Sequence, residues 1–333
     1  MNAESEADRA AANDNPAGGE IETADGVGQP EGQPATRSGF VAVIGAPNAG
    51  KSTLVNAMVG AKVTIVSHKV QTTRMPVRGI AMVGASQLVF VDTPGIFVPK
   101  RRLDRAMVEA AWGGAGDADV VAMIVDAARG LDEDVSRILE KLRSASNARL
   151  VLLLNKVDRV SDKGRLLKLA EELTKRVAFE RVFMISALNC SGVEDFKAYL
   201  AGVVPEGPWL YPEDDISDIP LRLLAAEITR ERIYHLLHDE LPYAITVETT
   251  DWKELRDKSV RIEQTVYVER DSQKSIVLGK GGRTVKQVSS EARKELQSIV
   301  ERPVHLFVFV KVREGWGNDP ERYRDIGLTF PKD

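Results

Sequence analysis

Short apolar runs alternate with segments of helical periodicity between residues 38 and 204. Runs of about four to eight apolar residues indicate buried strands, and apolar positions three and four residues apart indicate amphipathic helices. The pattern predicts strands at 40–44, 77–83, 87–91, 120–125, 150–154 and 182–185, and helices at 51–59, 104–113, 133–144, 164–176 and 192–203. Such alternation favours an α/β domain whose mostly parallel sheet is covered by helices on both faces.

The pattern changes after residue 204. Residues 205–220 (PEGPWLYPEDDISDIP) contain four prolines and five acidic residues, a composition typical of a linker. A helix at 222–239, strands at 244–248 and 260–269, a glycine-rich break, a further helix and a strand at 304–312 then indicate an α+β domain. We therefore predict a first domain at 38–204, a linker at 205–220 and a second domain with a C-terminal tail at 221–333.

Charge and composition set the N-terminal residues apart from the rest. Residues 1–36 hold eight acidic residues and one basic residue, with almost no large apolar side chains, so we predict that residues 1–37 form a disordered acidic tail. The whole chain has a net charge of −4, which leaves +3 for residues 37–333 and is compatible with a nucleic-acid partner. A single cysteine, Cys190, excludes an intramolecular disulfide, and no apolar run is long enough for a membrane-spanning helix.

The segment Gly45–Ser52 (GAPNAGKS) matches the phosphate-binding pattern G-x-x-x-x-G-K-[ST] and lies between a predicted strand and a predicted helix. Glycines let the backbone wrap closely around phosphate groups, and the helix N-terminus adds partial positive charge. In such loops the lysine, here Lys51, reaches the β- and γ-phosphates, and the hydroxyl, here of Ser52, coordinates Mg²⁺. The segment predicts a site for a nucleoside triphosphate.

Three further motifs follow predicted strands and together select guanine. Asp92–Gly95 (DTPG) supplies an acid that can hold Mg²⁺ through water and, at Gly95, a backbone N–H for the γ-phosphate. In Asn155–Asp158 (NKVD) a carboxylate can accept hydrogen bonds from N1–H and the exocyclic amine of guanine, a donor pair that adenine lacks. The backbone N–H groups of Ser186–Leu188 can meet guanine O6, and all three motifs lie where open α/β sheets bind ligands.

The predicted GTP-binding residues are Gly45, Ala46, Pro47, Asn48, Ala49, Gly50, Lys51, Ser52, Thr53, Asp92, Thr93, Pro94, Gly95, Asn155, Lys156, Asp158, Ser186, Ala187 and Leu188.

The order GAPNAGKS, QTTR, DTPG, NKVD, SAL resembles a translation-factor-type G domain, and specifically that of the Era family of bacterial GTPases. The resemblance implies a P-loop NTPase fold with GTP or GDP and Mg²⁺ as cofactors. It also implies that Gln71–Arg74 is the first switch, with Thr73 closing on Mg²⁺ and Thr72 as the neighbouring candidate. The implied metal-binding residues are Ser52, Thr73 and, through water, Asp92.

The residue after Gly95 bears on the hydrolysis rate. Ras-type enzymes orient the attacking water with a glutamine at this position, whereas this chain has Ile96, which neither donates nor accepts a side-chain hydrogen bond. We expect slow intrinsic hydrolysis without a side-chain general base, in which Lys51, Thr73 and Gly95 stabilise the transition state. The alternative is that Ile96 is an ordinary packing residue of its loop.

The segment Gly279–Gly282 (GKGG) matches the G-x-x-G loop of KH (K-homology) RNA-binding domains. One such match is a weak signal, but the order of strand, strand, glycine-rich loop, helix and strand supports it. Four basic residues and no acid between positions 274 and 286 can neutralise phosphates. Apolar residues before the loop would wall the groove, with core packing as the alternative. The predicted RNA-binding residues are Lys274, Ile276, Val277, Gly279, Lys280, Gly281, Gly282, Arg283 and Lys286.

Four segments of the second domain also resemble the Era family: 240–243 (ELPY), 290–294 (SEARK), 303–305 (PVH) and 311–316 (KVREGW). The resemblance implies a type II KH domain that binds 16S ribosomal RNA near its 3′ end and acts on the 30S subunit or its precursors. It further implies a cytoplasmic monomer, with weak peripheral association with the cytoplasmic face of the inner membrane.

Two other functions remain open at this point. The chain could be a nucleotide-regulated binding module in which hydrolysis is incidental, or a GTPase whose second domain binds a protein or a membrane instead of RNA. Turnover with and without small subunits distinguishes the first alternative, and RNA titration of a variant in the GKGG loop distinguishes the second.

Overall fold

The computed structural model describes residues 35–69, 71–145, 148–237 and 241–331. Most of the predicted disordered tail, residues 1–34, therefore lies outside the described residues. Residues Ala35–Asp333 form one compact unit that contains two sheets.

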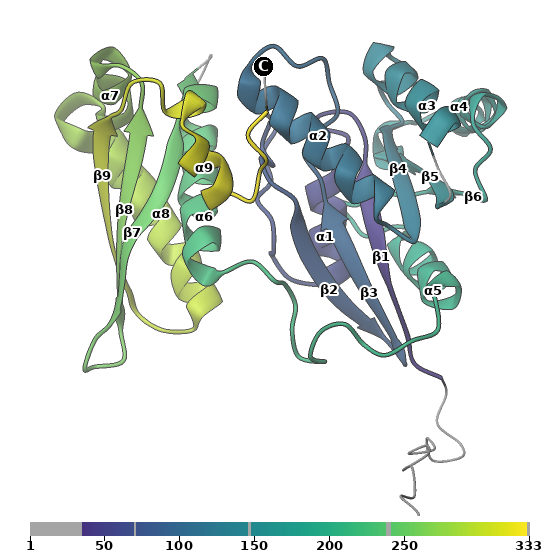
Figure 1. Ribbon diagram of the computed structural model, residues 1–333, viewed down its shortest axis with the longest axis horizontal. Helices are drawn as coiled ribbons and strands as arrows, with labels where there is room; N and C mark the ends of the chain where they lie inside the picture. Colours follow the sequence, from purple (N-terminus) through teal and green to yellow (C-terminus); the bar gives the residue numbers. More distant parts are fainter. Residues whose placement is uncertain (1–34, 70, 146–147, 238–240, 332–333) are drawn as a thin grey trace, which may run out of the picture. The chain divides into compact units, whose positions relative to one another are not determined.

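A six-stranded sheet forms the first domain, with strand order β2-β3-β1-β4-β5-β6 among the described residues. All neighbouring pairs are parallel except β2 and β3, which form the predicted hairpin (Figure 1). The mostly parallel α/β domain is thereby confirmed. The strands are β1 (Arg37–Ile44), β2 (Val77–Val83), β3 (Ser86–Asp92), β4 (Val120–Asp126), β5 (Arg149–Asn155) and β6 (Arg181–Met184).

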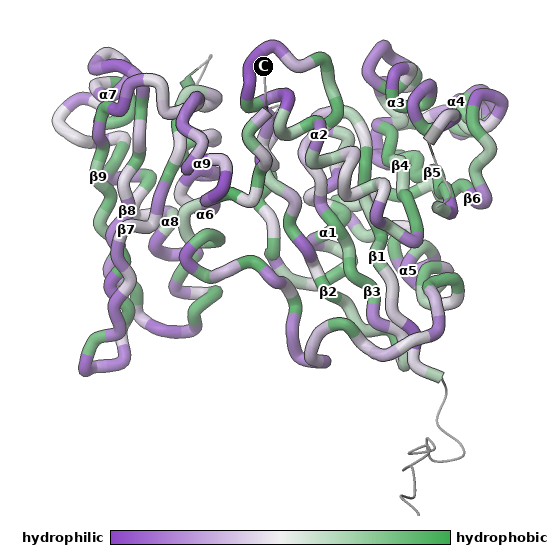
Figure 2. The backbone as a smooth tube through the Cα atoms, viewed as in Figure 1, coloured by the Kyte–Doolittle hydropathy of each residue, from purple (hydrophilic) through white to green (hydrophobic). Residues whose placement is uncertain are grey.

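Helices cover both faces of this sheet because its central strands are apolar on both sides. In β1, Val41 and Val43 pack in one core with α1 (Lys51–Val59) and α5 (Val193–Val203). The intervening Ala42 and Ile44 pack in a second core on the other face. Figure 2 shows the resulting concentration of hydrophobic residues in the central strands. The helices of the second face are α2 (Arg102–Gly116), α3 (Glu133–Ala145) and α4 (Lys163–Arg176).

The second domain is a three-stranded sheet of order β7-β8-β9, in which β8 pairs antiparallel with β7 and parallel with β9. Apolar side chains of the three strands face α6 and α8, so helices cover one side of the sheet. The predicted α+β arrangement is confirmed, although the sequence analysis missed α7 before the GKGG loop. The elements are α6 (Leu221–Leu236), β7 (Thr246–Glu254), β8 (Val260–Val268), α7 (Asp271–Leu278), α8 (Arg283–Val300), β9 (Val304–Val312) and α9 (Pro320–Asp325).

The predicted linker is held against the first sheet by a buried glutamine. Gln87, on β3, accepts hydrogen bonds from the backbone N–H groups of Leu210 (2.8 Å) and Tyr211 (3.0 Å) and donates to the carbonyl of Tyr211 (2.8 Å). Further along, the N–H of Ile80 donates to the carbonyl of Ile216 (2.9 Å). The segment at 205–220 is therefore an ordered strap along the β2–β3 hairpin.

The C-terminal residues pack on the first domain. Tyr323 and Leu328 are buried in a small cluster with Ala106 and Met107 of α2. None of the helices in the described part of the chain is long and apolar enough to cross a lipid bilayer.

We expect Gln87→Leu to release the strap, because leucine keeps most of the volume but leaves the N–H groups of Leu210 and Tyr211 without their acceptor. The free energy of unfolding should fall by about 2 kcal/mol or more, and proteolytic cleavage within 205–220 should become faster. The control is Ser38→Ala, which removes one exposed hydrogen bond to the same segment, from Ser38 Oγ to the carbonyl of Pro208. Equal effects of the two substitutions would contradict the role of Gln87.

Candidate functional site

The phosphate-binding loop connects β1 to α1 and depends on two glycines. Gly50 has φ +106°, and a Cβ there would lie 2.2 Å from the side-chain nitrogen of Asn155. A Cβ on Gly45 would lie 2.4 Å from the carbonyl oxygen of Ile124. The sequence pattern requires glycine at both positions for these steric reasons, which leave the loop backbone close to the sheet.

Lys51, the first residue of α1, is 6% exposed and lies inside this loop. Its Nζ donates to the carbonyl oxygens of Gly45 (3.2 Å) and Ala46 (3.1 Å). Burial lowers the pKa of Lys51 from 10.5 to about 8, and the opposite charge of Asp92 counteracts part of this effect. A buried ammonium with so few partners is suited to an anionic ligand.

Asp92 is fully buried at the end of β3 and accepts hydrogen bonds from three hydroxyl groups. Its Oδ2 accepts hydrogen bonds from Ser52 (2.8 Å), Thr64 (2.8 Å) and Thr73 (3.2 Å), and the hydroxyls of Ser52 and Thr73 lie 2.9 Å apart. Burial raises the pKa of the Asp92 carboxyl, while Lys51 and the three hydroxyls act to lower it.

These groups fit a hydrated Mg²⁺ ion. Asp92 Oδ1 is buried and has no hydrogen-bond partner among the described residues, so an acceptor remains for a metal-bound water. The hydroxyls of Ser52 and Thr73 are hard oxygen ligands of the kind Mg²⁺ takes. Thr72 is directed elsewhere, since its hydroxyl donates to the carbonyl of Lys69 (2.8 Å). The geometry therefore favours Thr73 over Thr72.

Asn155 connects the guanine motifs to the phosphate-binding loop. Its side-chain nitrogen donates to the carbonyl of Ala49 (2.8 Å), and its oxygen accepts from the N–H of Ala187 (2.9 Å). Lys156 donates to the carbonyl of Asn48 (2.6 Å) and pairs with Asp126 (2.7 Å). Asp158 is exposed in the turn that follows and forms no hydrogen bond or ion pair within the described residues, which leaves both carboxylate oxygens available to a base.

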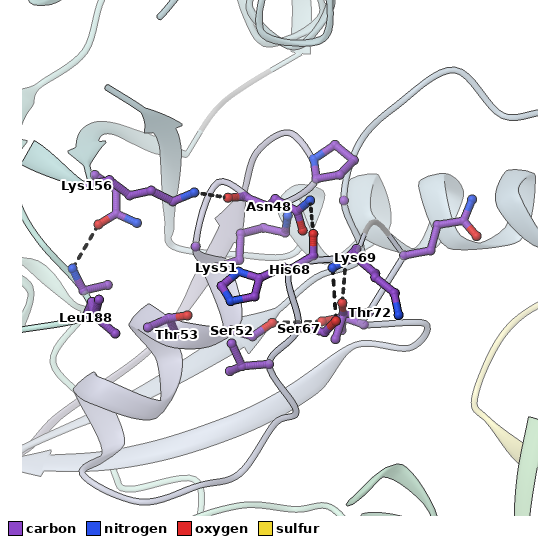
Figure 3. A pocket seen from close by; sticks show the side chains of 18 of the residues that line it. Asn48, Lys51, Ser52, Thr53, Ser67, His68, Lys69, Thr72, Lys156 and Leu188 are labelled. Atoms are coloured by element: carbon purple, nitrogen blue, oxygen red, sulfur yellow. Dashed lines mark hydrogen bonds between the residues drawn. The ribbon is translucent and has the colours of Figure 1, made fainter. Parts of the chain in front are cut away.

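A cavity of about 340 Å³ brings most of the predicted nucleotide residues together (Figure 3). Eight predicted residues do not line it: Asp158 is exposed, and the buried ones are Gly45, Ala46, Ala49, Asp92, Thr93, Pro94 and Ser186. The segment between α1 and the QTTR motif and a residue after NKVD line the cavity although no motif predicted them. The lining residues are Pro47, Asn48, Gly50, Lys51, Ser52, Thr53, Gln71, Thr72, Thr73, Gly95, Asn155, Lys156, Ala187 and Leu188, together with the missed Val66, Ser67, His68, Lys69 and Arg159.

The segment before the QTTR motif is attached to the phosphate-binding loop by a hydrogen bond that no motif predicts. The side chain of Asn48 donates to the carbonyl of His68 (2.9 Å), as Figure 3 shows. A polar residue in the loop between β1 and α1 gives no signal of such a contact, so only the fold could reveal it.

Ile96 is 6% exposed and packs in the second core, while its N–H donates to the carbonyl of Gly45 (3.1 Å). Its side chain therefore packs in the protein interior. Gly95 lies so close to the loop that a Cβ would come within 3.0 Å of Pro47 Cα. These contacts place the Gly95 backbone beside the phosphate-binding loop.

The switch segment is also bonded to α6 of the second domain. Arg230 is 1% exposed, and its Nη2 donates to the carbonyl of Thr72 (2.6 Å). Arg74 donates to the carbonyl of Ile245 (2.7 Å) and lies over the ring of Trp316 (5.6 Å). The contact of Arg230 was not predicted, because an arginine on a helix normally indicates a solvated face. The partners of Arg74 were not predicted either, because they come from distant parts of the chain.

Two acids of the second domain extend this attachment. Glu231 accepts from the N–H of Val66 (2.7 Å) and pairs with Lys62 (2.5 Å), and Glu295 pairs with the same lysine. Residues 62–69 and 71–74 are therefore held on one side by the nucleotide site and on the other by α6 and α8.

The GKGG loop separates α7 from α8 and is left-handed at its last two glycines, with φ +63° at Gly281 and +76° at Gly282. A Cβ at either position would meet no atom within 4 Å, so the backbone is open to a ligand. The basic side chains around it form no ion pairs within the described residues, and Lys280, Arg283 and Lys286 are exposed.

Of the two apolar residues predicted to contact RNA, one is exposed and the other is buried. Ile276 is 55% exposed, but Val277 is 1% exposed and packs in the core with Val288 and Val310. The prediction that Val277 contacts RNA is therefore wrong, since consecutive residues of a helix point about 100° apart and α7 turns Val277 inward.

Two family models match separate parts of the chain. A model of 50S ribosome-binding GTPases matches residues 40–156, and a KH domain model matches residues 240–317. The GTPase Era of Rhizobium meliloti (strain 1021) is 64% identical over 297 residues, which cover 89% of this chain and 94% of the relative. The chain belongs to the Era family of GTPases.

The GTPase Era of Brucella suis biovar 1 (strain 1330) is 62% identical over 95% of this chain and 98% of its own length. Two solved Era structures match with a TM-score of 0.84 and 36% identity, over 88% of this chain and 99% of theirs. One is Era in complex with MgGDPNP and nucleotides 1506–1542 of 16S ribosomal RNA, and the other is a variant of Aquifex aeolicus Era bound to GDP·AlF₄⁻. As an Era-family member, the chain is a GTPase with a P-loop G domain followed by a KH domain.

We expect nucleotide binding to this Era-family site to take up a proton at about pH 9. Burial sets the pKa of Lys51 to about 8, so at pH 9 most molecules carry a neutral Lys51. The negative charges of the phosphates favour the protonated form, so binding should add a proton. Affinity should therefore fall as pH rises from about 8 toward 10.5. Titration calorimetry in two buffers of different ionisation enthalpy measures the uptake.

The control is Lys51→Arg, whose guanidinium stays charged over this range. If this variant retains binding, it should bind without the proton uptake. Equal uptake by both proteins would assign the proton to another group.

Proposed function

We propose that this GTPase binds 16S ribosomal RNA near its 3′ end in a GTP-dependent cycle during biogenesis of the 30S subunit. The observation that carries the proposal is the bond from Arg230 to the carbonyl of Thr72, because it joins the KH domain to the residue beside Thr73. The Era structure that carries both MgGDPNP and a 16S ribosomal RNA segment supports it, since that protein aligns with 88% of this chain.

In the nucleotide site, GTP or GDP binds with Mg²⁺. We assign the metal to Ser52, Thr73 and, through water, Asp92, whose free Oδ1 suits a water ligand. Mg²⁺ supplies charge neutralisation at the β- and γ-phosphates. The charge of Lys51 and the backbone N–H of Gly95 also stabilise the phosphate groups. The carboxylate of Asp158 accepts hydrogen bonds from the guanine base.

Hydrolysis proceeds without a water-orienting side chain after Gly95, because Ile96 is held in the core. We therefore assign a slow intrinsic rate. Backbone groups and an ordered Thr73 position the attacking water. The KH domain affects the order of Thr73 through the hydrogen bond from Arg230 of α6 to Thr72.

In the KH domain, the backbone of Gly279–Gly282 approaches the RNA phosphates, and Lys280, Arg283 and Lys286 neutralise them. Lys274, in the middle of α7, is half-buried, and Ile276 offers an exposed apolar surface. We place the protein on 30S subunits or their precursors in the cytoplasm. The monomeric state and the weak association with the inner membrane stay predictions.

RNA titration of Gly281→Asp in the full-length protein tests the KH assignment. An acid at this position adds a negative charge where phosphate would lie, so affinity for the 3′ end of 16S ribosomal RNA should fall about tenfold or more. The side chain would enter open space, and the fold should persist.

The matched control is Gly84→Asp in the β2–β3 turn, which has a similar left-handed φ of +57° and equally open surroundings. It should leave RNA affinity unchanged. If Gly281→Asp binds RNA as tightly as this control, the second domain has another partner, such as a protein or a membrane.

Arg230→Lys should uncouple the two sites. Lysine keeps the positive charge beside Glu227, but it lacks the planar fork in which Nε and Nη2 hold the Glu227 carboxylate while Nη2 also reaches the carbonyl of Thr72. We expect the ratio of RNA affinities with a GTP analogue and with GDP to fall by about fivefold or more toward unity.

The control for this measurement is Arg222→Lys, which alters another arginine of α6 that bonds only within the KH domain, to the carbonyl of Thr249. It should retain the wild-type ratio. An unchanged ratio in Arg230→Lys would show that the coupling, if present, uses other contacts.

A further inference from the structure

The KH sheet has an outward face that α6, α7 and α8 do not cover. Residues of β9 alternate between its two sides, and the inward Val304, Leu306 and Val310 pack against α6, α7 and α8. On the other side, Phe307 is 45% exposed and Phe309 is 48% exposed. Two neighbouring phenylalanines of one strand thus expose their rings to solvent.

The C-terminal tail covers only the opposite part of this face. Arg322 pairs with Glu248 of β7 (2.6 Å) and lies over the ring of Tyr267 of β8 (5.0 Å). Thr265, which pairs with Phe309 across the strands, is 1% exposed. The tail therefore leaves the part of the face that belongs to β9 open.

One neutral ion pair and one unpaired positive charge lie beside the two rings. Arg261 lies over the ring of Phe307 (5.0 Å) and is paired with Glu263 (2.5 Å), so that acid is neutralised. Lys311, two residues after Phe309 on the same face, is exposed and forms no ion pair within the residues that the structure describes. Flat aromatic rings beside cations match unpaired nucleotides, which stack their bases and require neutral or positive surroundings for their phosphates.

The edge strand that carries the two phenylalanines packs, on its inward side, against α7, the helix that precedes the GKGG loop. β9 is the edge strand of the sheet, and its C-terminal half packs against α7 through Val310 and Val277 (Figure 1). On the helix side, Ser289 Oγ of α8 donates to the carbonyl of Leu306 (3.2 Å). Because Phe307 and Phe309 lie on the other face of this edge strand, an RNA strand that leaves the loop between α7 and α8 would reach them by passing around the edge of β9.

We propose that Phe307 and Phe309, with Arg261 and Lys311, form a second RNA-contacting surface on which unpaired bases next to the GKGG-bound segment stack. The inference rests on the proposed RNA-binding function and extends it by a surface with its own chemistry.

Titration of the full-length protein with two RNAs tests the inference. One is a strand of about four nucleotides, which the GKGG loop alone can hold, and the other is the same strand extended by three unpaired nucleotides at each end. Wild type should bind the extended strand more tightly. The double variant Phe307→Leu/Phe309→Leu should lose this gain, by about fivefold or more, and should bind the short strand as wild type does.

The matched control is Phe307→Tyr/Phe309→Tyr, which retains the aromatic rings and should retain the gain. Both pairs alter exposed side chains, so the fold should persist. Equal binding of both strands by wild type would overturn this inference and leave the KH assignment intact, whereas binding of neither strand would overturn both. If the leucine variant keeps the gain but loses affinity for 30S subunits, the rings face a protein and the inference is wrong.

Discussion

The buried carboxylate of Asp92 is the constraint around which the nucleotide site is organised. An unpaired charge inside a protein is strongly unfavourable unless hydrogen bonds and an opposite charge compensate it. The compensation here comes from Ser52 at the start of α1, Thr64 after α1 and Thr73 in the switch segment, together with Lys51. One side chain therefore fixes three segments of the chain at a common point, and any ligand that attracts Lys51 or the hydroxyls must change that balance.

The same constraint extends to the KH domain through consecutive residues. Thr73 bonds Asp92 with its hydroxyl, the carbonyl of Thr72 accepts from Arg230, and the guanidinium of Arg74 enters the KH domain. Planar peptide units link these residues, so one of the three cannot shift far without moving the others. A ligand shifts the switch segment between two conformations only if it binds one of them more tightly than the other. In the site proposed above, a γ-phosphate with Mg²⁺ would do so through Thr73. This is the physical reason to expect RNA affinity to depend on the nucleotide.

The sequence predicted the features that depend on local pattern and missed those that depend on tertiary contacts. Strand and helix periodicity placed the elements of the G domain to within a few residues, and the glycine motifs placed the phosphate loop. The strap at 205–220 reads as a free linker because its anchor, Gln87, is a polar residue in an apolar strand. Arg230 and Glu231 read as solvated charges of a helix, although both are buried against the switch. Val277 shows the same limit, because an apolar residue beside a loop can face the core or a ligand.

In β9, the difference between what the apolar pattern predicts and what the fold covers points to a binding surface. Its apolar residues at nearly every position (VHLFVFVKV) are typical of a strand covered on both faces, yet the fold covers one. Apolar surface left exposed beside a basic loop is better explained by a partner than by packing, because packing would favour polar residues on a solvated face. The phenylalanines alternate with inward valines, so they occupy that open face by register, and a one-residue shift of the strand would bury them. Their exposure is therefore a property of the fold that the pattern of the strand alone would not have predicted.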